Sequence, residues 1–302
     1  MKHLASLFLV ALAIMSCAKP KANAATTMTA EEPDTTVEHI SAIYTEQDST
    51  KIVELLNVYN SGTNLPLFYA RKFIGRPYTA HTLEGNAHET LVVNTRGLDC
   101  TTLVETVTAL TICKKKKLKT FQDYLRILRD LRYRQGELKD YTSRLHYFSD
   151  WIIDNEKMGY VKEIKSPNPP FSATQHINAC YMTQHFSDYQ ALRLNPQFLP
   201  AIRETEQNLS GKTCKYIPKD QVLDNDEMRQ AIHDGDIIAI TCDKPGLEIA
   251  HLGFAVWKKD GLHLLNASSL KSNMQVVEET VTLYRYLEKQ PHDTGIRVIR
   301  IL

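Results

Sequence analysis

The sequence lacks the cysteine and histidine patterns that hold metal ions. Its six cysteines and 11 histidines include no CxxC pair and no cluster with the spacing of a zinc site. We therefore predict no metal site, and we expect no other cofactor. The net charge is only +1, so nothing in the composition argues for nucleic acid as a partner. After the first 16 residues no segment is long and apolar enough to span a membrane, and there is no internal repeat.

The N-terminus, in contrast, has the features of an export signal. Lys2 and the apolar run from Leu4 to Met15 correspond to the charged and hydrophobic regions of a secretory signal. Ile14-Met15-Ser16-Cys17 then has the pattern of a bacterial lipobox. This pattern predicts that Cys17 is lipidated and tethers the protein to a membrane. The alternative is cleavage after Ala22-Asn23-Ala24, which would release a soluble protein.

We divide the chain into three parts on this basis. Residues 1–17 are the lipoprotein signal with its lipidated cysteine, residues 18–48 are a polar, flexible tether, and residues 49–302 are a single folded domain. Ala-Lys-Pro-Lys follows Cys17 without an acidic residue, which favours an inward-facing anchor in the periplasm. An exported compartment permits disulfides, and the sequence leaves three pairings open for Cys113, Cys180, Cys214 and Cys242.

One stretch of this domain, from Asn94 to Glu105, places a cysteine at a predicted helix start. A Gly-containing loop leads to Cys100, and the apolar residues that follow recur at helical spacing. Thr102 and Glu105 have the spacing of a capping box. A thiol at a helix N-terminus is shifted toward the thiolate, and the free N–H groups there can hold an oxyanion. A cysteine alone is nevertheless more often a buried core residue.

A second stretch supplies partners for this cysteine. The run from Gly235 to Ile240 and the run from Ile249 to Trp257 are predicted strands, with His251 near the start of the second. The turn at residues 258–261 brings Asn266 back beside His251. A cysteine, a histidine and an amide in this arrangement can form a nucleophile, a base and the group that orients the base.

These motifs resemble the NlpC family of papain-like cell-wall amidases and peptidases. Four short motifs occur in that family's order: Gly75-Arg76-Pro77-Tyr78, Leu98-Asp99-Cys100, Gly235-Asp236-Ile237 and His251-Leu252-Gly253. The run from Arg144 to Trp151 and Asn266-Ala267-Ser268-Ser269 are similar to a branch, long catalogued as a domain of unknown function, that contains periplasmic N-acetylmuramoyl-L-alanine amidases. The resemblance covers roughly residues 50–302. The chain departs from the family's usual Trp-Gly-Gly after the tyrosine, where it has Thr79-Ala80-His81.

The resemblance implies both a fold and a reaction. We expect an α+β fold of the papain-like NlpC type, with N-terminal helices packed on a C-terminal antiparallel sheet and a helical insertion at residues 115–210. The expected function is a cysteine amidase that cleaves the bond between the lactyl group of N-acetylmuramic acid and L-alanine. Its partners would be small peptidoglycan fragments such as GlcNAc-1,6-anhydro-MurNAc-peptides. Cys100 would be the nucleophile, His251 the base and Asn266 the orienting group.

Other residues are candidates for contacts with the substrate. Tyr78 corresponds to a family tyrosine beside the nucleophile and is either a hydrogen-bond donor to the oxyanion or a residue packed under the loop. Asp99 and Thr101 flank Cys100 and are, like Tyr78, candidates for contacts with the oxyanion or the substrate. Further candidates come from segments rich in polar and aromatic residues, which suit sugar and peptide recognition: Glu84, Ser143, Arg144, His146 and Tyr147.

Two alternative functions remain at this point. The first is a γ-D-glutamyl–diamino acid endopeptidase, which would need an acidic anchor for the free L-Ala amine of a stem peptide; Glu84 is the nearest candidate. The second is a non-catalytic lipoprotein that binds peptidoglycan. A disulfide that engages Cys100 would favour the second, because an oxidised thiol cannot attack a carbonyl.

Overall fold

The computed structural model describes residues 39–59 and 64–302, which belong to one compact unit. The predicted signal, Cys17 and most of the predicted tether lie outside these residues. The folded unit begins before the predicted boundary at residue 48. Strand β1 (Ala42–Ile43) pairs in parallel with β2 (Leu91–Val92), and Asp48 is completely buried. Asp48 accepts hydrogen bonds from the N–H and the hydroxyl of Thr95, both at 2.8 Å, and so ties this first segment to the loop that leads to Cys100.

An antiparallel sheet of eight strands forms the centre of this α+β unit. Its order is β4-β5-β10-β6-β7-β8-β9, and β3 pairs with the remaining part of β10 beside β5. Every pairing in this sheet is antiparallel, as predicted. The strands are β3 (Val161–Ile164), β4 (Ala173–His176), β5 (Thr213–Pro218), β6 (Ile237–Cys242), β7 (Ile249–Lys258), β8 (Gly261–Ser268), β9 (Gln275–Glu278) and β10 (Asp293–Ile301).

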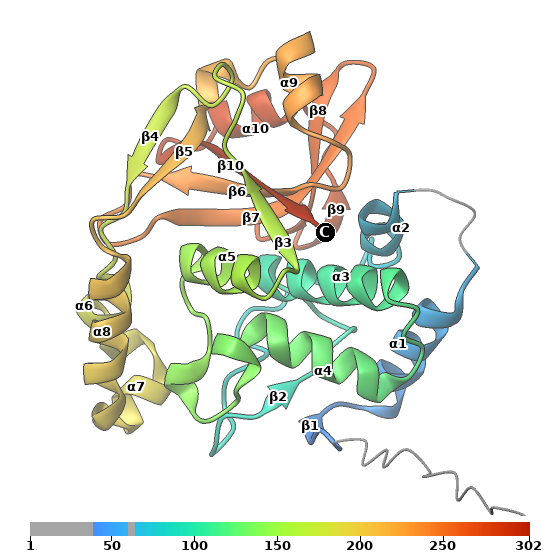
Figure 1. Cartoon of the computed structure of the whole chain (residues 1–302), viewed down its shortest axis with the longest axis vertical. Coiled ribbons are helices and arrows are strands. Elements are labelled where there is room, and N and C mark those ends of the chain that lie inside the picture. The colour runs from blue at the N-terminus through green and yellow to red at the C-terminus, as the bar shows by residue number, and fades with distance from the viewer. Residues whose placement is uncertain (1–38, 60–63) are drawn as a thin grey trace, which may run out of the picture. The chain divides into compact units, whose positions relative to one another are not determined.

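Helices cover both faces of this sheet (Figure 1). The first five pack on one face, and α9 and α10 pack on the other. Alternate residues of β6 therefore enter two cores: Ile237 and Ala239 face the first helices, whereas Ile238 and Ile240 face α9 and α10. The α-helices are α1 (Glu46–Asn57), α2 (Leu65–Arg71), α3 (Cys100–Lys115), α4 (Phe121–Arg132), α5 (Phe148–Lys157), α6 (Tyr181–Gln184), α7 (Gln190–Leu194), α8 (Leu199–Leu209), α9 (Asp226–Ala231) and α10 (Leu283–Glu288).

The insertion predicted at residues 115–210 is not wholly helical. It contains β3 and β4, both of which join the main sheet. Its last part, α6 to α8, forms a small third core around Leu192 and Ile202. Strand β5 lies inside the sheet, because β4 pairs with its outer side. Helix α5 of this insertion begins at Phe148, so the candidates His146 and Tyr147 stand just before it.

The N-terminus of α3 is capped by a different pair from the one predicted. Asp99 is the N-cap: its Oδ1 accepts from the Thr102 N–H at 2.8 Å, and its own N–H donates to Thr102 Oγ1 at 2.9 Å. Glu105, the predicted partner of Thr102, is buried and pairs instead with Arg132 on α4. The capping residue thus stands one position before Cys100, so Cys100 occupies the first position of the helix.

Candidate active site

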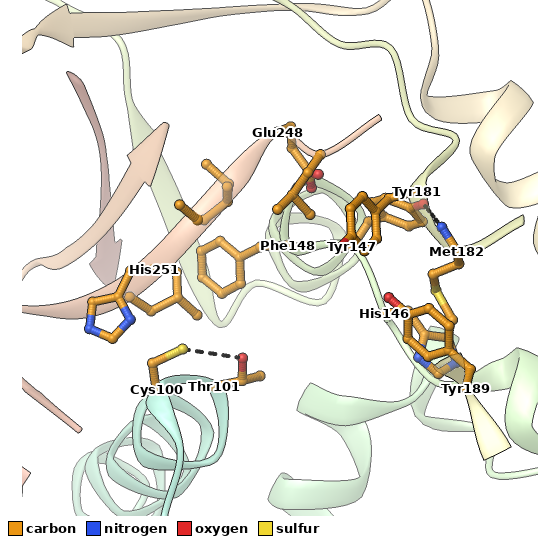
Figure 2. A pocket seen from close by; sticks show the side chains of 14 residues that line it. Cys100, Thr101, His146, Tyr147, Phe148, Tyr181, Met182, Tyr189, Glu248 and His251 are labelled. Carbon is orange, nitrogen blue, oxygen red and sulfur yellow. Dashed lines mark hydrogen bonds between the residues drawn. The ribbon is translucent and has the colours of Figure 1, made fainter. Parts of the chain in front are cut away.

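A cavity of about 170 Å³ lies between the start of α3, the start of β7 and the α5–α6 region. Figure 2 shows Cys100 and His251 at one end of this cavity and Tyr181, Met182 and Tyr189 at the other. The side chains at the nucleophile end come from α3 and β7, which belong to the two halves of the fold. The motifs that the sequence analysis paired therefore line one site. All five cysteines of the described residues are free thiols, so Cys100 is not engaged in a disulfide.

Cys100 projects from the first turn of α3 and is half-buried. Its Sγ lies 4.0 Å from Thr101 Oγ1. Burial, with a smaller contribution from the negative charge of Asp99, raises the pKa of the thiol to about 12. Backbone N–H groups of Leu252 and Thr101 act in the opposite direction without overcoming this effect. The expected shift toward the thiolate is therefore not found in the free protein, because burial outweighs the helix N-terminus.

His251 is held by the predicted amide. Its Nε2 lies 2.9 Å from Asn266 Oδ1, across the turn that joins β7 to β8. Since an amide oxygen can only accept, Nε2 carries a proton in this contact and Nδ1 is left as the basic nitrogen. Burial lowers the pKa of His251, and the hydrogen bond to Asn266 and the nearby carboxylates of Asp293, Glu279 and Asp99 only partly offset this. The ring is thus available as a neutral base.

A further carboxylate stands behind Asn266. Asn266 is completely buried, and its Nδ2 donates to Glu279 Oε1 at 3.1 Å. Glu279 follows β9, the strand that pairs with β8 opposite Asn266. Neither β9 nor Glu279 was predicted from the sequence. The signal that could have found them is the short apolar pair Val276-Val277 after the turn at Asn273, which indicates a third strand of a meander.

Tyr78 lies beside the loop that carries Cys100. Its backbone pairs with Leu98, and its N–H donates to the Met274 carbonyl at 2.9 Å. Burial raises the pKa of Tyr78, and the charges of Cys100 and Asp99 raise it further. The close approach of the two segments requires Gly97, because a Cβ there would collide with the side chain of Thr79. Tyr78 is half-buried against the core, so it both packs under the loop and stands near the nucleophile.

Two of the other candidates, His146 and Tyr147, line the cavity with Cys100. The Tyr147 hydroxyl is already occupied, because it donates to Glu206 Oε1 at 2.7 Å and accepts from the Met182 N–H at 3.1 Å. His146 Nε2 contacts the Tyr141 carbonyl at 2.7 Å, and burial lowers the pKa of this histidine to about 3. The Tyr147 hydroxyl and His146 Nε2 are therefore already engaged within the protein.

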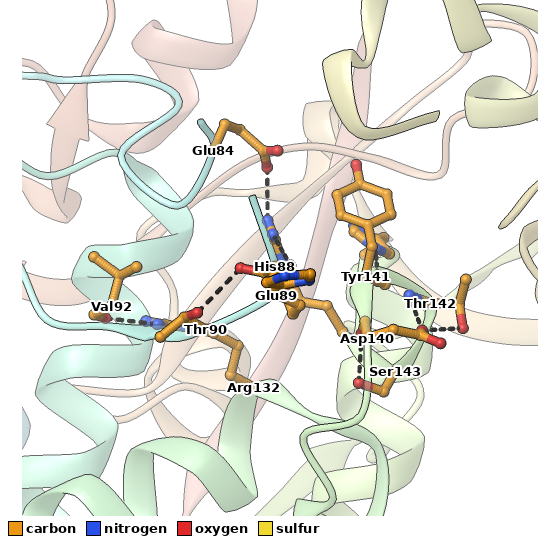
Figure 3. A network of polar contacts seen from close by, with 12 residues as sticks. Glu84, His88, Glu89, Thr90, Val92, Arg132, Asp140, Tyr141, Thr142 and Ser143 are labelled. Carbon is orange, nitrogen blue, oxygen red and sulfur yellow. Dashed lines mark hydrogen bonds and ion pairs between the residues drawn. The ribbon is translucent and has the colours of Figure 1, made fainter. Parts of the chain in front are cut away.

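Thr101 also lines this cavity, next to Cys100, whereas Glu84, Arg144 and Ser143 lie outside it. Arg144 is buried between two carboxylates, with Nη2 at 2.7 Å from Glu89 and Nη1 at 2.6 Å from Glu84. These residues line a neighbouring cavity of about 370 Å³, part of whose polar network is drawn in Figure 3. Because its charge is already balanced, Arg144 is poorly suited to bind a substrate carboxylate. Ser143 lines a third cavity, and its hydroxyl donates to the Asp140 carbonyl at 2.6 Å.

Comparison with known proteins now identifies the family. A model of the AmiA-like family, described as N-acetylmuramoyl-L-alanine amidase-like, matches residues 69–296. The chain belongs to this amidase-like family. The match spans both the Cys100 segment and the strands that carry His251 and Asn266. No match is found among curated proteins.

Several solved structures are similar to this chain. An N-acetylmuramoyl-L-alanine amidase from Bacteroides uniformis is 38% identical, with a TM-score of 0.73 over 79% of this chain and 97% of that chain. A Bacteroides fragilis protein provisionally named a xylanase is 37% identical, with a TM-score of 0.72 over 78% of this chain and 100% of the other. Protein LPG0564 from Legionella pneumophila is 24% identical, with a TM-score of 0.66 over 85% of this chain and 95% of the other, and it shares the fold.

Glu248 is a second residue of this amidase-like site that sequence reasoning missed. It is buried in the cavity wall, and its Oε1 accepts from the Ser149 N–H at 3.1 Å. Burial raises the pKa of this carboxyl. In the sequence, only its position three residues before His251 could have identified Glu248 as a site residue.

Among residues 39–59 and 64–302, no three His, Cys, Asp or Glu side chains are grouped in a way that could hold a metal ion. Over the same part of the chain, the helices are too short or too polar to cross a membrane.

Proposed function

We propose that this protein is a cysteine amidase that hydrolyses the amide between the lactyl group of N-acetylmuramic acid and L-alanine in peptidoglycan fragments. Amidase-like family membership supports the substrate class. The single observation that carries the chemistry is the 2.9 Å contact between His251 and Asn266 in the site that also holds the free thiol of Cys100. Small soluble fragments such as GlcNAc-1,6-anhydro-MurNAc-peptides are the proposed substrates.

The proposed reaction begins with proton transfer from the Cys100 thiol to His251 Nδ1 as the sulfur attacks the amide carbonyl. The tetrahedral intermediate collapses with loss of the L-Ala amine, which takes the proton from His251. The lactyl group is then a thioester on Cys100. A water molecule gives a proton to His251 and attacks this thioester, which releases the carboxylic acid and returns the thiol.

The oxyanion of each intermediate needs donors. The N–H of Cys100 is one, since the first N–H groups of a helix have no acceptor within the helix. Tyr78 is the second, because it stands beside the Cys100 loop and its raised pKa keeps the phenol protonated. Asp99 is excluded from this role: a carboxylate is an acceptor, and here it caps α3.

We also propose a papain-like, NlpC-type arrangement, in which a helix presents the cysteine to a histidine on the neighbouring sheet. The packing of α3 against β7 and β8 supports it. The proposed location is the periplasm, with Cys17 lipidated and anchored in the membrane; the signal pattern of residues 1–17 supports this part of the proposal.

One observation favours a second candidate, the γ-D-glutamyl–diamino acid endopeptidase. Glu248 places a carboxyl group in the same cavity as Cys100 and could anchor the free L-Ala amine of a stem peptide. Glu84, the earlier candidate for this anchor, is instead paired with Arg144 in the neighbouring cavity. Burial holds Glu248 toward its neutral form, which weakens it as an anchor for a cation and leaves the amidase as the preferred function.

Product analysis by mass spectrometry separates the two activities. The purified full-length protein is incubated with a defined anhydro-muropeptide and, separately, with the free stem peptide. We expect an intact disaccharide and a peptide that begins with L-Ala. Cleavage after D-Glu, chiefly on the free stem peptide, would establish the endopeptidase instead.

The Cys100→Ala variant is the matched control for this assay. Since it removes only the thiol, it should fold normally, bind the muropeptide and form no product. Residual turnover above background by a folded Cys100→Ala protein would exclude the proposed nucleophile.

A further inference from the structure

The side-chain amide of Asn266 can be placed in two ways that differ by a half-turn. In one, Oδ1 faces His251 and the ring must donate from Nε2. In the other, the NH₂ group faces His251, Nε2 must accept, and the ring proton moves to Nδ1. The second arrangement would remove the free base, because Nδ1 is the nitrogen left for Cys100. Asn266 is completely buried, so water does not decide between the two.

We propose that Glu279 is a positioning residue, which fixes the Asn266 amide and through it the tautomer of His251. An ionised carboxylate can only accept hydrogen bonds. Glu279 Oε1, 3.1 Å from Asn266 Nδ2, therefore requires the NH₂ group on its own side and turns Oδ1 toward His251. This inference rests on the proposed roles of Cys100 and His251. It adds Glu279 to the group formed by Cys100, His251 and Asn266.

The surroundings of Glu279 hold its carboxylate in place. Asn273 Nδ2 lies 3.2 Å from Oε1 and 3.4 Å from Oε2. The Glu279 N–H donates to the Leu264 carbonyl at 2.9 Å, which fixes the main chain against β8. Its carbonyl accepts from Lys258 Nζ at 3.2 Å and lies 3.0 Å from His263 Nδ1. Two side-chain amides thus donate to one carboxylate, and neither of them supplies a positive charge that would neutralise it.

The chemical consequence is directional. The acceptor on Glu279 sets the orientation of the Asn266 amide. That orientation in turn sets which nitrogen of the His251 ring carries the proton. A neutral side chain without an acceptor at position 279 leaves Nδ2 of Asn266 without a partner in a buried site. The amide then gains nothing from its present orientation, and the wrong tautomer becomes populated. Because only part of the protein then holds the free base on Nδ1, kcat/KM is expected to fall several-fold.

The decisive measurement is the nitrogen NMR spectrum of His251 in ¹⁵N-histidine-labelled protein at pH 8. The His251→Gln spectrum identifies the signals of this ring. We expect Nε2 protonated and Nδ1 unprotonated in the native protein. In Glu279→Met, which keeps side-chain length but cannot accept, we expect a mixture of both tautomers. A spectrum of Glu279→Met that matches the native one would overturn the proposal.

Two further variants distinguish a positioning role of Glu279 from a general disturbance of the structure. Glu279→Gln keeps one accepting oxygen and should retain the native tautomer and most of the activity; a tautomer mixture in this folded variant would contradict the proposal. This variant also serves if Glu279→Met does not fold. Adding Asn266→Asp to Glu279→Met places a group at position 266 that only accepts, so it should restore the Nε2–H tautomer. No restoration would likewise count against Glu279 acting through Asn266.

Asp236→Asn is the matched control. Asp236 is also a buried carboxylate, which accepts from two nitrogens of Arg300 at 2.9 and 2.7 Å and from the His233 N–H at 2.8 Å. It has no hydrogen bond to Asn266 or His251. Its variant should lose stability and keep the His251 tautomer. Because the spectrum is independent of turnover, an inactive native protein with the expected tautomer shift in Glu279→Met would refute the proposed function while supporting the positioning role.

Discussion

The Cys100 thiol and the His251 ring are both driven toward their neutral forms. Burial raises the pKa of the thiol to about 12 and lowers that of the imidazole below its usual 6.5. A preformed thiolate–imidazolium pair would require both pKa shifts to be in the opposite direction. We infer that the proton leaves the thiol as the sulfur attacks, with His251 acting as a general base.

The pH dependence of kcat/KM tests this inference. The base is active only when neutral, so activity should be lost as the pH falls through the pKa of His251, which lies below 6.5. No alkaline decrease from the thiol is expected below about pH 12. Hydrolysis of the muropeptide measured from pH 4 to 10 should show one acidic limb and a plateau. Rapid alkylation by iodoacetamide at pH 5, the mark of a preformed thiolate, would argue against it.

Asp99 allows the electrostatic part of this argument to be tested separately. Its charge raises the pKa of the Cys100 thiol, while its oxygen caps α3. Asp99→Asn keeps a good cap and removes the charge, so alkylation of Cys100 at pH 8 should become several times faster without loss of stability. Asp99→Ala removes both and should also cost about 1 kcal/mol of folding stability, as measured by urea unfolding. Equal alkylation rates in Asp99→Asn and the native protein would show that the charge is irrelevant.

The residues predicted from the sequence are those whose partners are set by local geometry. Asn266 reaches His251 because a short turn joins two adjacent strands. Arg144 had the right chemistry for a substrate carboxylate, but the sequence gives no sign of the two glutamates that neutralise it from a loop more than 50 residues earlier. Glu248 and Glu279 were missed for the same reason, since their importance depends on which element packs beside them.

At the level of elements, α3 differs most from its prediction. The sequence pattern indicates one apolar face, yet every residue from Thr102 to Cys113 is buried. The helix lies between α4, α2 and the sheet, so its polar residues are also enclosed. Glu105 is stabilised there by Arg132 Nε at 2.7 Å, and Arg132 Nη1 donates to the Val92 carbonyl at 2.7 Å. Arg132 is thus a buried residue of α4 rather than part of its solvated face.

Removal of this pair's negative partner should be costly. Glu105→Gln leaves the guanidinium of Arg132 buried without a counter-charge, which is expected to lower the free energy of unfolding by about 3 kcal/mol. Urea unfolding followed by circular dichroism provides the value. The double variant Glu105→Leu/Arg132→Met replaces both charges with apolar groups and should recover most of the loss. A double variant less stable than Glu105→Gln would show that the charges themselves stabilise α3 against α4.

The elements that were missed are short and depend on distant partners. Strands β3 and β4 have four residues each and flank the Pro-rich loop at residues 166–172. Their pairing partners, β10 and β5, lie far along the chain. Local propensity has little influence on such strands, because the hydrogen bonds that stabilise them come from another part of the sequence. The longer strands β6 and β7 carry apolar runs in the sequence itself and were predicted with small errors at their ends.

Across the folded unit, one buried arginine joins the sheet to the helices that carry the site. Arg297 on β10 has Nε at 2.6 Å from Glu163 Oε1 on β3, and its Nη1 donates to Ser149 Oγ on α5 at 2.7 Å. The N–H of the same serine binds Glu248 in the cavity wall. This connection runs from the sheet to the cavity that contains Cys100. Its contribution to stability should depend on which charge loses its partner.

The two charges of this connection are not equally replaceable. Glu163 also binds Lys165 at 2.9 Å, and Lys165 is half-exposed, so Arg297→Met leaves Glu163 with a counter-ion. Glu163→Leu removes the ion pair of Arg297 and leaves it a hydrogen bond to the neutral hydroxyl of Ser149, with the Glu248 carboxyl nearby. This variant should cost about 3–5 kcal/mol of folding stability. Urea unfolding should therefore rank Glu163→Leu as clearly less stable than Arg297→Met. Because an uncompensated buried charge is the cause, adding Arg297→Met to Glu163→Leu should increase stability, and a further decrease would refute this explanation.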